Sequence, residues 1–143
     1  IGEIERSEEF RNEVETRHLN LKVSANAVAH AAVVAARQIN IGVIAVVTDS
    51  GGAARLMSEY RPKAKIVAFT SDEVVYQRLA LCWGVTPVWM APTMTQEELY
   101  ENVEQEILAR QYAQPGDPII ITSAVPVGCG AQTNQMKIHH ISL

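Results

Sequence analysis

Five short apolar segments alternate along the chain with longer segments in which apolar residues recur at helical spacing. The short segments are rich in β-branched residues and cover 41–47, 65–69, 85–90, 118–125 and 136–141. Continuous apolar runs of this length are typical of strands that are covered on both faces. The last segment, MKIHHI, is more polar and follows a turn-rich stretch. We therefore expect five strands, with the fifth at an edge of the sheet.

The intervening segments carry helix signals. A helix capped by Ser24 is expected to run to about Gln38, and its many alanines and valines suit close packing against a sheet. Two further helix starts match the capping-box spacing, Thr70 with Glu73 and Thr95 with Glu98. After the second of these, apolar residues recur at helical spacing, at Leu99, Val103 and Ile107. Helices are therefore expected between the strands.

This alternation of strand and helix predicts an α/β fold in which right-handed crossovers connect parallel strands. We expect three layers, αβα, around a mostly parallel five-stranded sheet of order 3-2-1-4-5 whose last strand is antiparallel. Residues 20–143 form a single domain in this prediction. Residues 1–19 are rich in Glu and Arg, and we expect them to be a surface helix or a linker stub.

Composition and charge narrow the class of protein. Of the 143 residues, 48% are hydrophobic and 20% charged, and the net charge is -4, as in ordinary globular domains. A nucleic-acid partner is not expected without a basic surface, and no membrane span is expected because no apolar run approaches roughly 20 residues. Two cysteines are too few for a disulfide framework and are typical of reduced thiols in a cytoplasmic protein. Because the chain is charged from residue 3 onward and begins without Met, we expect a domain excised from a longer protein.

Two glycine-rich loops carry the candidate chemistry. In a doubly wound sheet, ligands bind beyond the C-terminal strand ends where the strand order reverses, here between the first and fourth strands. The first strand leads into TDSGGAA at 48–54, directly before a helix, and the fourth leads into VGCGAQTN at 127–134. Hydroxyls and glycines before a helix N-terminus favour an anion, because backbone N–H groups converge there. The two loops therefore predict an anion site in this crevice.

Other interpretations of these loops stay open. Glycine-rich turns are also common where nothing binds, and Asp49 opposes a phosphate unless its side chain points away. Neither loop ends in the Lys-Ser or Lys-Thr of a Walker loop, and the G-x-G-x-x-G dinucleotide pattern is absent. The four histidines share no spacing that would build a metal site or a catalytic set. These residues indicate a binding module without catalytic or metal-ligating groups.

Two long stretches of the chain resemble the C-terminal domain of pyruvate kinase. The first, VVTDSGGAARLMSEYRPKAKIVAFTSDEVVYQRLALCWGVTPV, is similar to the family's run of T-x-S-G, helix, Tyr-Arg-Pro turn, strand and Leu-Ala-x-x-Trp-Gly-Val. The second, GDPIIITSAVPVGCGAQTNQMKIHHI, is similar to its G-D and G-x-x-G-x-T-N motifs and the strand after them. The match runs in order from about Ser24 to Ile141, and it places Gly116, Asp117, Thr133 and Asn134 at motif positions.

The resemblance implies a regulatory and oligomerisation role. In the family, the parent enzyme transfers phosphate from phosphoenolpyruvate to ADP in glycolysis, on a separate barrel that holds magnesium and potassium ions. We therefore expect neither catalysis nor a cofactor in this chain alone. The family's C-terminal domain often binds a phosphorylated effector, which is a sugar phosphate or a nucleotide monophosphate. The matching positions here are Thr48, Ser50, Gly51 and Gly52 in the first loop, and Gly130, Thr133 and Asn134 in the second.

The first loop departs from the pattern of activated relatives, which often have a basic residue and a hydroxyl where Gly52 and Ala53 stand. Asp49 adds a negative charge to the same loop. Loss of one or two charge-assisted hydrogen bonds, each worth roughly 1.5–3 kcal/mol, predicts phosphate binding that is about tenfold to several thousandfold weaker. The stretch APTMTQEEL also lacks the Trp and Arg with which animal enzymes hold fructose 1,6-bisphosphate.

Assembly is the other role that the resemblance implies, because these domains pair across a two-fold axis through the last strand and the first long helix. An unpaired edge at 136–141 fits such a homo-oligomer contact, but Lys137 and two histidines there are equally typical of an edge shielded from association. Two alternative functions stay open. One is a purely structural subunit-contact domain with a degenerate effector site, and the other is a free-standing phosphate-binding protein.

Overall fold

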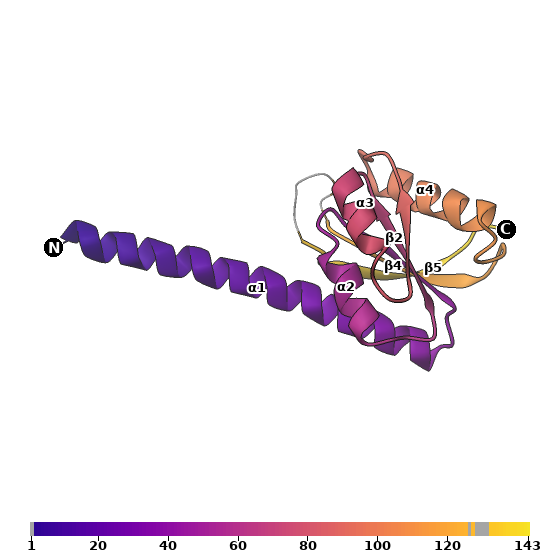
Figure 1. The fold of residues 1–143 in the computed structure, drawn as a ribbon, viewed down its shortest axis with the longest axis horizontal. Coiled ribbons are helices and arrows are strands. Elements are labelled where there is room, and N and C mark those ends of the chain that lie inside the picture. The colour runs from indigo at the N-terminus through magenta and orange to yellow at the C-terminus, as the bar shows by residue number, and fades with distance from the viewer. Residues whose placement is uncertain (1, 126, 128–131) are drawn as a thin grey trace.

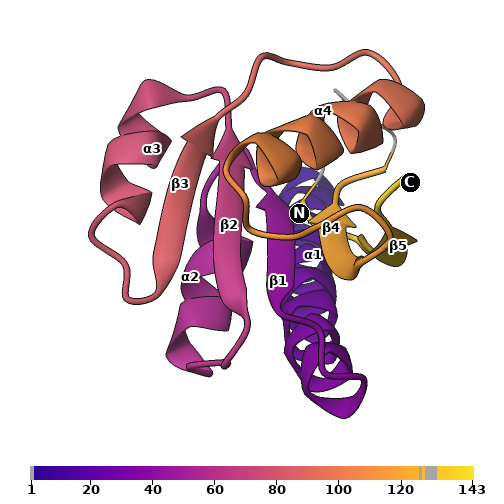
Figure 2. The ribbon, with the colours of Figure 1, turned by 90° about the vertical axis from the view of Figure 1, so that its right-hand side faces the viewer.

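The computed structural model describes residues 2–125, 127 and 132–143, which fold around a five-stranded sheet (Figure 1). The strands are β1 (Val43–Val47), β2 (Lys65–Thr70), β3 (Val85–Trp89), β4 (Pro118–Ser123) and β5 (Gln135–His140). Their order is β3-β2-β1-β4-β5, and all neighbours are parallel except β4 and β5 (Figure 2). The predicted strand order and the antiparallel direction of the last strand are confirmed.

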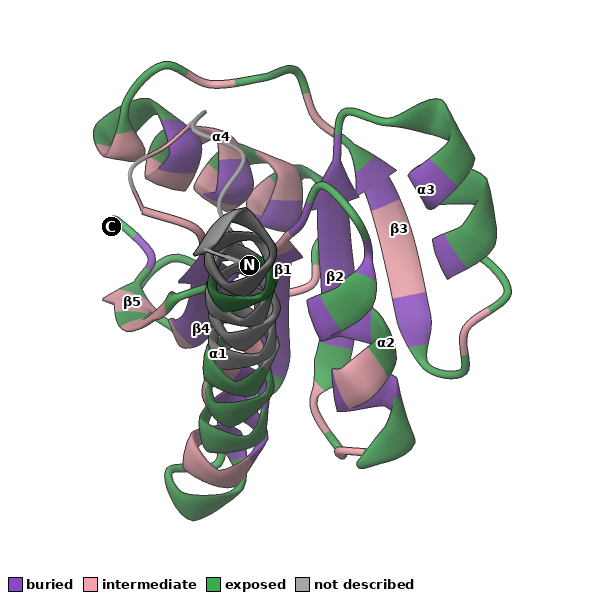
Figure 3. Ribbon diagram, turned by 90° about the vertical axis from the view of Figure 1, so that its left-hand side faces the viewer, coloured by how far each residue is buried: buried purple, intermediate pink, exposed green. Residues whose placement is uncertain are grey.

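Helices cover both faces of this sheet. They are α1 (Gly2–Gln38), α2 (Gly52–Glu59), α3 (Glu73–Leu79) and α4 (Gln96–Ala109). Figure 3 shows α1 and α2 crossing one face, with α4 behind the other. Side chains of α1, α2 and α3 pack with Ile44, Ile66 and Ile120 on the first face, whereas those of α4 pack with Phe69 and Ile121 on the second. The predicted three-layer αβα arrangement is confirmed.

The central strand β1 is buried on both faces, as its continuous apolar sequence predicts. Val43 and Ala45 belong to the core under α4, and Ile44 and Val46 belong to the core under α1 and α2. Successive side chains of a strand point to opposite faces, so a strand between two helical layers favours apolar residues at successive positions.

The helix starts show where local signals compete. Thr95 caps α4 as predicted, because its Oγ1 accepts a hydrogen bond of 3.2 Å from the backbone N–H of Glu98. The predicted cap of α3 at Thr70 is wrong, because Thr70 remains in β2. Asp72 caps α3 instead and accepts a 2.8 Å hydrogen bond from the N–H of Val74. Asp is as good an N-cap as Thr and stands two residues closer to the helix.

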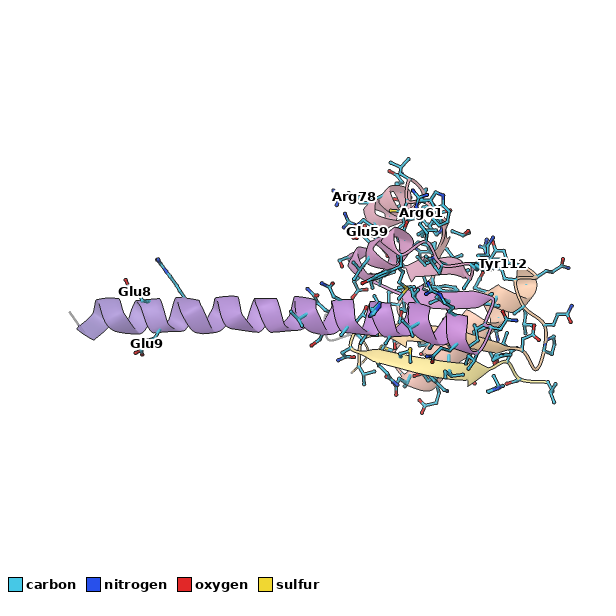
Figure 4. The ribbon with its side chains drawn as sticks, turned by 90° about the horizontal axis from the view of Figure 1, so that it is seen from below. Glu8, Glu9, Glu59, Arg61, Arg78 and Tyr112 are labelled. Atoms are coloured by element: carbon cyan, nitrogen blue, oxygen red, sulfur yellow. The ribbon has the colours of Figure 1, made fainter. Side chains whose placement is uncertain are left out.

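Helix α1 is longer than predicted, and its N-terminal part projects away from the sheet (Figure 1). It passes through Ser24, so the predicted start at that residue is wrong. No glycine or proline stands between residues 3 and 41, so nothing in that stretch interrupts a helix. Glu8 and Glu9 are exposed on the projecting part (Figure 4). The predicted division between residues 19 and 20 falls inside α1 and stays a prediction.

The C-terminal third of α1 packs against the sheet through small side chains. Ala29, Ala32, Val33 and Ala36 are buried there, on one face of the helix. Small residues allow the helix backbone to approach the strands closely, in agreement with the interpretation of this alanine-rich segment. Within the described part of the chain, no helix combines the length and hydrophobicity needed to cross a membrane.

Candidate functional site

A pocket of about 490 Å³ lies at the C-terminal ends of the parallel strands. Residues that follow β1, β2, β3 and β4 line it, together with the first turn of α2, Leu99 of α4, and Ala25 and Asn26 of α1. The strand order reverses here, because β1 lies between β2 and β4. The pocket therefore occupies the crevice that the strand order predicted.

The first glycine-rich loop forms one wall of the pocket through two hydroxyl groups that hold its own backbone. Thr48 is buried, and its Oγ1 accepts a 2.8 Å hydrogen bond from the N–H of Gly51. Ser50 Oγ accepts a longer bond of 3.3 Å from the N–H of Gly52. Thr48, Ser50 and Gly52 all line the pocket. These hydrogen bonds within the loop hold its backbone conformation, and the hydroxyl-bearing residues Thr48 and Ser50 still line the pocket.

Gly51 lies behind this wall and makes the turn possible. It is the N-cap of α2 and has φ of 82°, in the left-handed region, with no side-chain cap. A Cβ atom at Gly51 would lie 3.3 Å from side-chain atoms of both Val75 and Leu79. Glycine alone adopts this conformation without strain and leaves this space free. Gly51 therefore shapes the site without lining it.

The N-terminus of α2 faces the pocket, because its first two residues, Gly52 and Ala53, line it. Backbone N–H groups in a first helical turn have no acceptor within the helix and carry a partial positive charge. Gly52 donates to Ser50, as described above. The N–H groups of Ala53 and Ala54 point along the helix axis toward the end that faces the pocket. This end of α2 therefore presents the partial positive charge of the helix dipole to the pocket.

The second glycine-rich loop meets the pocket through Val127, Gln132 and Thr133, and Thr133 is only 7% exposed. Asn134 does not line the pocket, because its side chain pairs with the backbone of Val125. Gly130, the remaining predicted site residue, lies outside the residues that the structure describes. The structure thus brings Thr48, Ser50, Gly52 and Thr133 to one pocket, with Gly51 and Asn134 beside it.

The charge of the pocket is low and negative. Among the described residues that line it, Asp49 alone has an ionisable side chain, and none is Lys or Arg. Arg55, on α2, is exposed and is not a lining residue. Lys63 precedes β2 and so belongs to the opposite end of the parallel strands. The loss of basic residues inferred from the first loop therefore applies to the whole described wall.

The remaining wall is part hydroxyl and part apolar. Thr70, Ser71 and Thr93 add hydroxyl groups, and Phe69 and Met90 add apolar surface. Phe69 and Thr70 end β2, and Ser71, Met90 and Thr93 follow β2 or β3. All five could therefore have been found by extending the rule about C-terminal strand ends to every parallel strand. Asn26 had no such signal, because only the packing of α1 brings it to the pocket.

A second polar cluster joins α4 to β5, away from the pocket. His139 Nε2 donates a 2.8 Å hydrogen bond to Glu104 Oε1, which also accepts one of 2.8 Å from the N–H of Ser142. Burial raises the pKa of Glu104, but the hydrogen bonds from His139 and Ser142 outweigh it and leave the pKa below its ordinary value. The cluster fastens the end of the chain to α4. No group of three or more potential metal ligands occurs within the described residues.

Sequence comparisons match this chain to one family over both glycine-rich loops. A family model described as pyruvate kinase, alpha/beta domain, matches residues 26–139. The pyruvate kinase of Sporosarcina psychrophila is 34% identical over 137 residues, which are 93% of this chain and 23% of that protein. That of Lactococcus lactis subsp. lactis is 40% identical over 107 residues, which are 75% of this chain and 21% of that protein. The chain spans about a fifth of the length of these curated relatives.

Solved structures show the same fold. A crystal structure of a pyruvate kinase from Cryptosporidium parvum matches with a TM-score of 0.72 and 28% identity, over 81% of this chain and 22% of that one. The structure of Cryptosporidium parvum pyruvate kinase in complex with ADP matches with a TM-score of 0.71 and 29% identity, over 81% of this chain and 23% of that one. The sheet and its helices therefore resemble one segment of those longer chains.

Proposed function

Because the chain belongs to the pyruvate kinase family and matches its alpha/beta domain, we propose that it is the regulatory and oligomerisation domain of a cytoplasmic pyruvate kinase. The parent enzyme would transfer phosphate from phosphoenolpyruvate to ADP in glycolysis. This domain would bind a phosphorylated effector in the pocket between β1 and β4 and would not catalyse the reaction alone. The effector class is a sugar phosphate or a nucleotide monophosphate.

The observation that supports effector binding is the convergence of an exposed helix end and hydroxyl groups on one pocket. The first turn of α2 and the hydroxyls of Thr48 and Ser50 lie on the same wall. Phosphate oxygens accept hydrogen bonds from first-turn N–H groups, and the helix dipole favours their charge. The pocket volume of about 490 Å³ is within the range typical of small-molecule sites. One phosphate and one sugar or nucleoside would fit this arrangement.

The ligand's uncharged part would contact the rest of the wall. Phe69, Met90 and Leu99 offer apolar surface to a ring, and Thr70, Ser71 and Thr93 offer hydroxyls to a polyol. No described lining residue is basic and Asp49 is acidic, so the affinity for phosphate should be modest. A ligand with two phosphates would lack a partner for the second one. Millimolar or high micromolar binding of a monophosphate is the expected regime.

Thermal denaturation with and without ligand tests effector binding. Inorganic phosphate, AMP, glucose 6-phosphate and fructose 1,6-bisphosphate are suitable probes. A ligand at ten times its Kd stabilises the folded state by about 1.4 kcal/mol, which raises the Tm of a domain of this size by roughly 3–6 °C. Tm values that stay constant with every probe at millimolar concentration would reject the effector site.

A matched pair of serine variants locates the binding. Ser50→Ala removes a hydroxyl at the pocket wall, whereas Ser142→Ala removes one from the cluster at Glu104. If the ligand binds as proposed, the first variant should weaken it severalfold and the second should leave it unchanged. Equal affinities for both variants would place the ligand elsewhere on the domain.

The oligomerisation role is supported by the shape of the two sheet edges. β3 contains Pro87, which has no N–H group and so weakens this edge for strand addition. β5 is the other edge; it has six residues and no proline, and Ile138 on it is 44% exposed. A second copy of the chain could extend the sheet at β5. Sedimentation velocity should show a dimer for the wild type and a monomer for Ile138→Asp, and a monomeric wild type would argue against this contact.

A second candidate is a structural subunit-contact domain whose effector site is degenerate. The absence of basic residues from the described pocket wall and the presence of Asp49 favour it. Thermal denaturation with the phosphate probes and sedimentation velocity together distinguish an effector-binding domain from a purely structural one. A dimer that binds none of the phosphate probes supports the structural role alone.

A further inference from the structure

Asn134 makes an unusual pair of hydrogen bonds at the base of the second loop. Its Oδ1 accepts from the N–H of Val125 at 2.8 Å, and its Nδ2 donates to the carbonyl oxygen of the same residue at 2.8 Å. Its own backbone N–H donates to the carbonyl oxygen of Ser123 at 3.1 Å. Three hydrogen bonds thus tie Asn134 to the two residues that flank Ala124.

The side-chain amide of Asn134 here stands in for a peptide unit. β4 and β5 are paired antiparallel up to Ser123 and Gln135, and the segments that continue from these two strands separate beyond that pair. Backbone pairing with Val125 would require an N–H and a C=O from the opposite segment, and the side-chain amide of Asn134 supplies one of each. Asn134 thereby extends the connection between the two segments by two residues, from Ser123 to Val125.

We infer that Asn134 is a positioning residue for the ligand pocket, which it serves by holding Val125 and thereby setting Thr133 and Ala124 against the ligand. This inference rests on the proposed effector site. Ala124 precedes Val125, Thr133 precedes Asn134, and both line the pocket. A change in the separation of these two segments would therefore move both lining residues, Ala124 and Thr133, at once. Asn134 itself contacts no ligand, because its amide oxygen and one amide N–H face Val125.

The chemistry of the pair requires asparagine. Aspartate has the same shape, but its carboxylate cannot donate and would face the carbonyl oxygen of Val125. Glutamine has both groups on a chain that is longer by one methylene, which displaces them. Alanine provides neither group. Asn134→Asp and Asn134→Ala both remove the bond to the Val125 carbonyl, but only the first adds a charge near the pocket.

The test combines ligand affinity with amide hydrogen exchange, using the chain with AMP and inorganic phosphate as probes. Asn102→Asp is the matched control, because Asn102 lies on α4 beside a different hollow, next to Trp89. In Asn134→Ala and Asn134→Asp the affinity should fall about tenfold or more, which corresponds to about 1.4 kcal/mol. The N–H of Val125 should exchange faster in Asn134→Ala, which provides no acceptor for it, whereas that of Ile120 in β4 should exchange as in the wild type.

The outcomes separate this inference from the proposed function. A wild type that binds neither probe rejects the proposed site, and the positioning role with it. A wild type that binds, with both variants binding equally well, rejects the positioning role alone. Weaker binding only in Asn134→Asp would assign the effect to charge and would overturn the inference. A lower Tm with unchanged affinity would mean that Asn134 serves only stability, which also contradicts the inference.

Discussion

Replacing Gly51 by alanine should destabilise the domain and weaken its pocket together. Gly51 has φ of 82°, and an L-residue in the left-handed region costs about 1–2 kcal/mol. The new Cβ would also lie 3.3 Å from side-chain atoms of Val75 and Leu79, which must each move by a few tenths of an ångström. Crowding of this kind adds up to about 1 kcal/mol. The free energy of unfolding should therefore fall by about 1–3 kcal/mol, and Tm by about 3–10 °C.

Gly42→Ala is the matched control for this prediction. A Cβ at Gly42 meets nothing within 4 Å, and its φ is not in the left-handed region. Alanine there should change the stability by no more than about 0.5–1 kcal/mol, and it should stabilise if it has any effect. Urea denaturation and thermal denaturation, followed by circular dichroism, measure both variants under the same conditions.

The two variants should differ in ligand affinity as well. The strain at Gly51 acts on the N-cap of α2, so relaxing it displaces the first-turn N–H groups that face the pocket. Binding of AMP or inorganic phosphate should weaken in Gly51→Ala and stay unchanged in Gly42→Ala. If Gly51→Ala is as stable as Gly42→Ala and binds as well, the role assigned to this turn is wrong.

Three further predictions concern charge, burial and pH. Asp49→Asn removes the acidic group from the pocket wall and should tighten phosphate about three- to tenfold at low salt, as measured by calorimetry; equal affinities would show that the carboxylate points away. Thr122→Val should raise the free energy of unfolding by about 1–2 kcal/mol, because Thr122 Oγ1 is buried in β4 without a hydrogen-bond partner among the described residues. A lower stability in urea denaturation would reveal a bond that the hydroxyl makes. Glu104→Gln should destabilise the domain near neutral pH, and the difference from the wild type should shrink as the pH falls below the ordinary value of 4.5, because the lowered pKa of Glu104 contributes stability only while the carboxylate is ionised. A difference that is constant between about pH 7 and pH 3 would contradict this assignment.

Most of the fold follows from sequence patterns that have strong local causes. The continuous apolar runs identify strands buried on both faces, as in β1, and the strand-helix alternation then restricts the sheet order. Thr95 was found as a cap because its spacing to Glu98 matches the capping box, and its Oγ1 accepts a hydrogen bond from the N–H of Glu98. Asp72 was missed because the capping-box spacing of Thr70 with Glu73 satisfied the same rule two residues earlier. The length of α1 was missed because Ser24 is an acceptable cap that also tolerates a helix interior.

The pocket residues that lie at strand ends could be predicted from the sequence. Those whose position depends on tertiary packing or on side-chain hydrogen bonds could not. Thr48, Ser50 and Thr133 were assigned from the two loops, and all three line the pocket. Asn134 matched the same motif, but its hydrogen bonds to Val125 are formed by tertiary geometry that a motif does not specify. Asn26 reaches the pocket only through the packing of α1. The ligand roles of these residues, and the position of Gly130, stay predictions.

The proposed function requires that a phosphate group bind at the N-terminus of α2 in this pocket. Backbone amide resonances report it most directly, in heteronuclear NMR spectra recorded while AMP or inorganic phosphate is added. We expect saturable shifts for the N–H groups of Gly52, Ala53 and Ala54, with smaller shifts at Thr133 and none at the distant Lys65. Saturable shifts confined to other parts of the domain, or none at millimolar ligand, would contradict it.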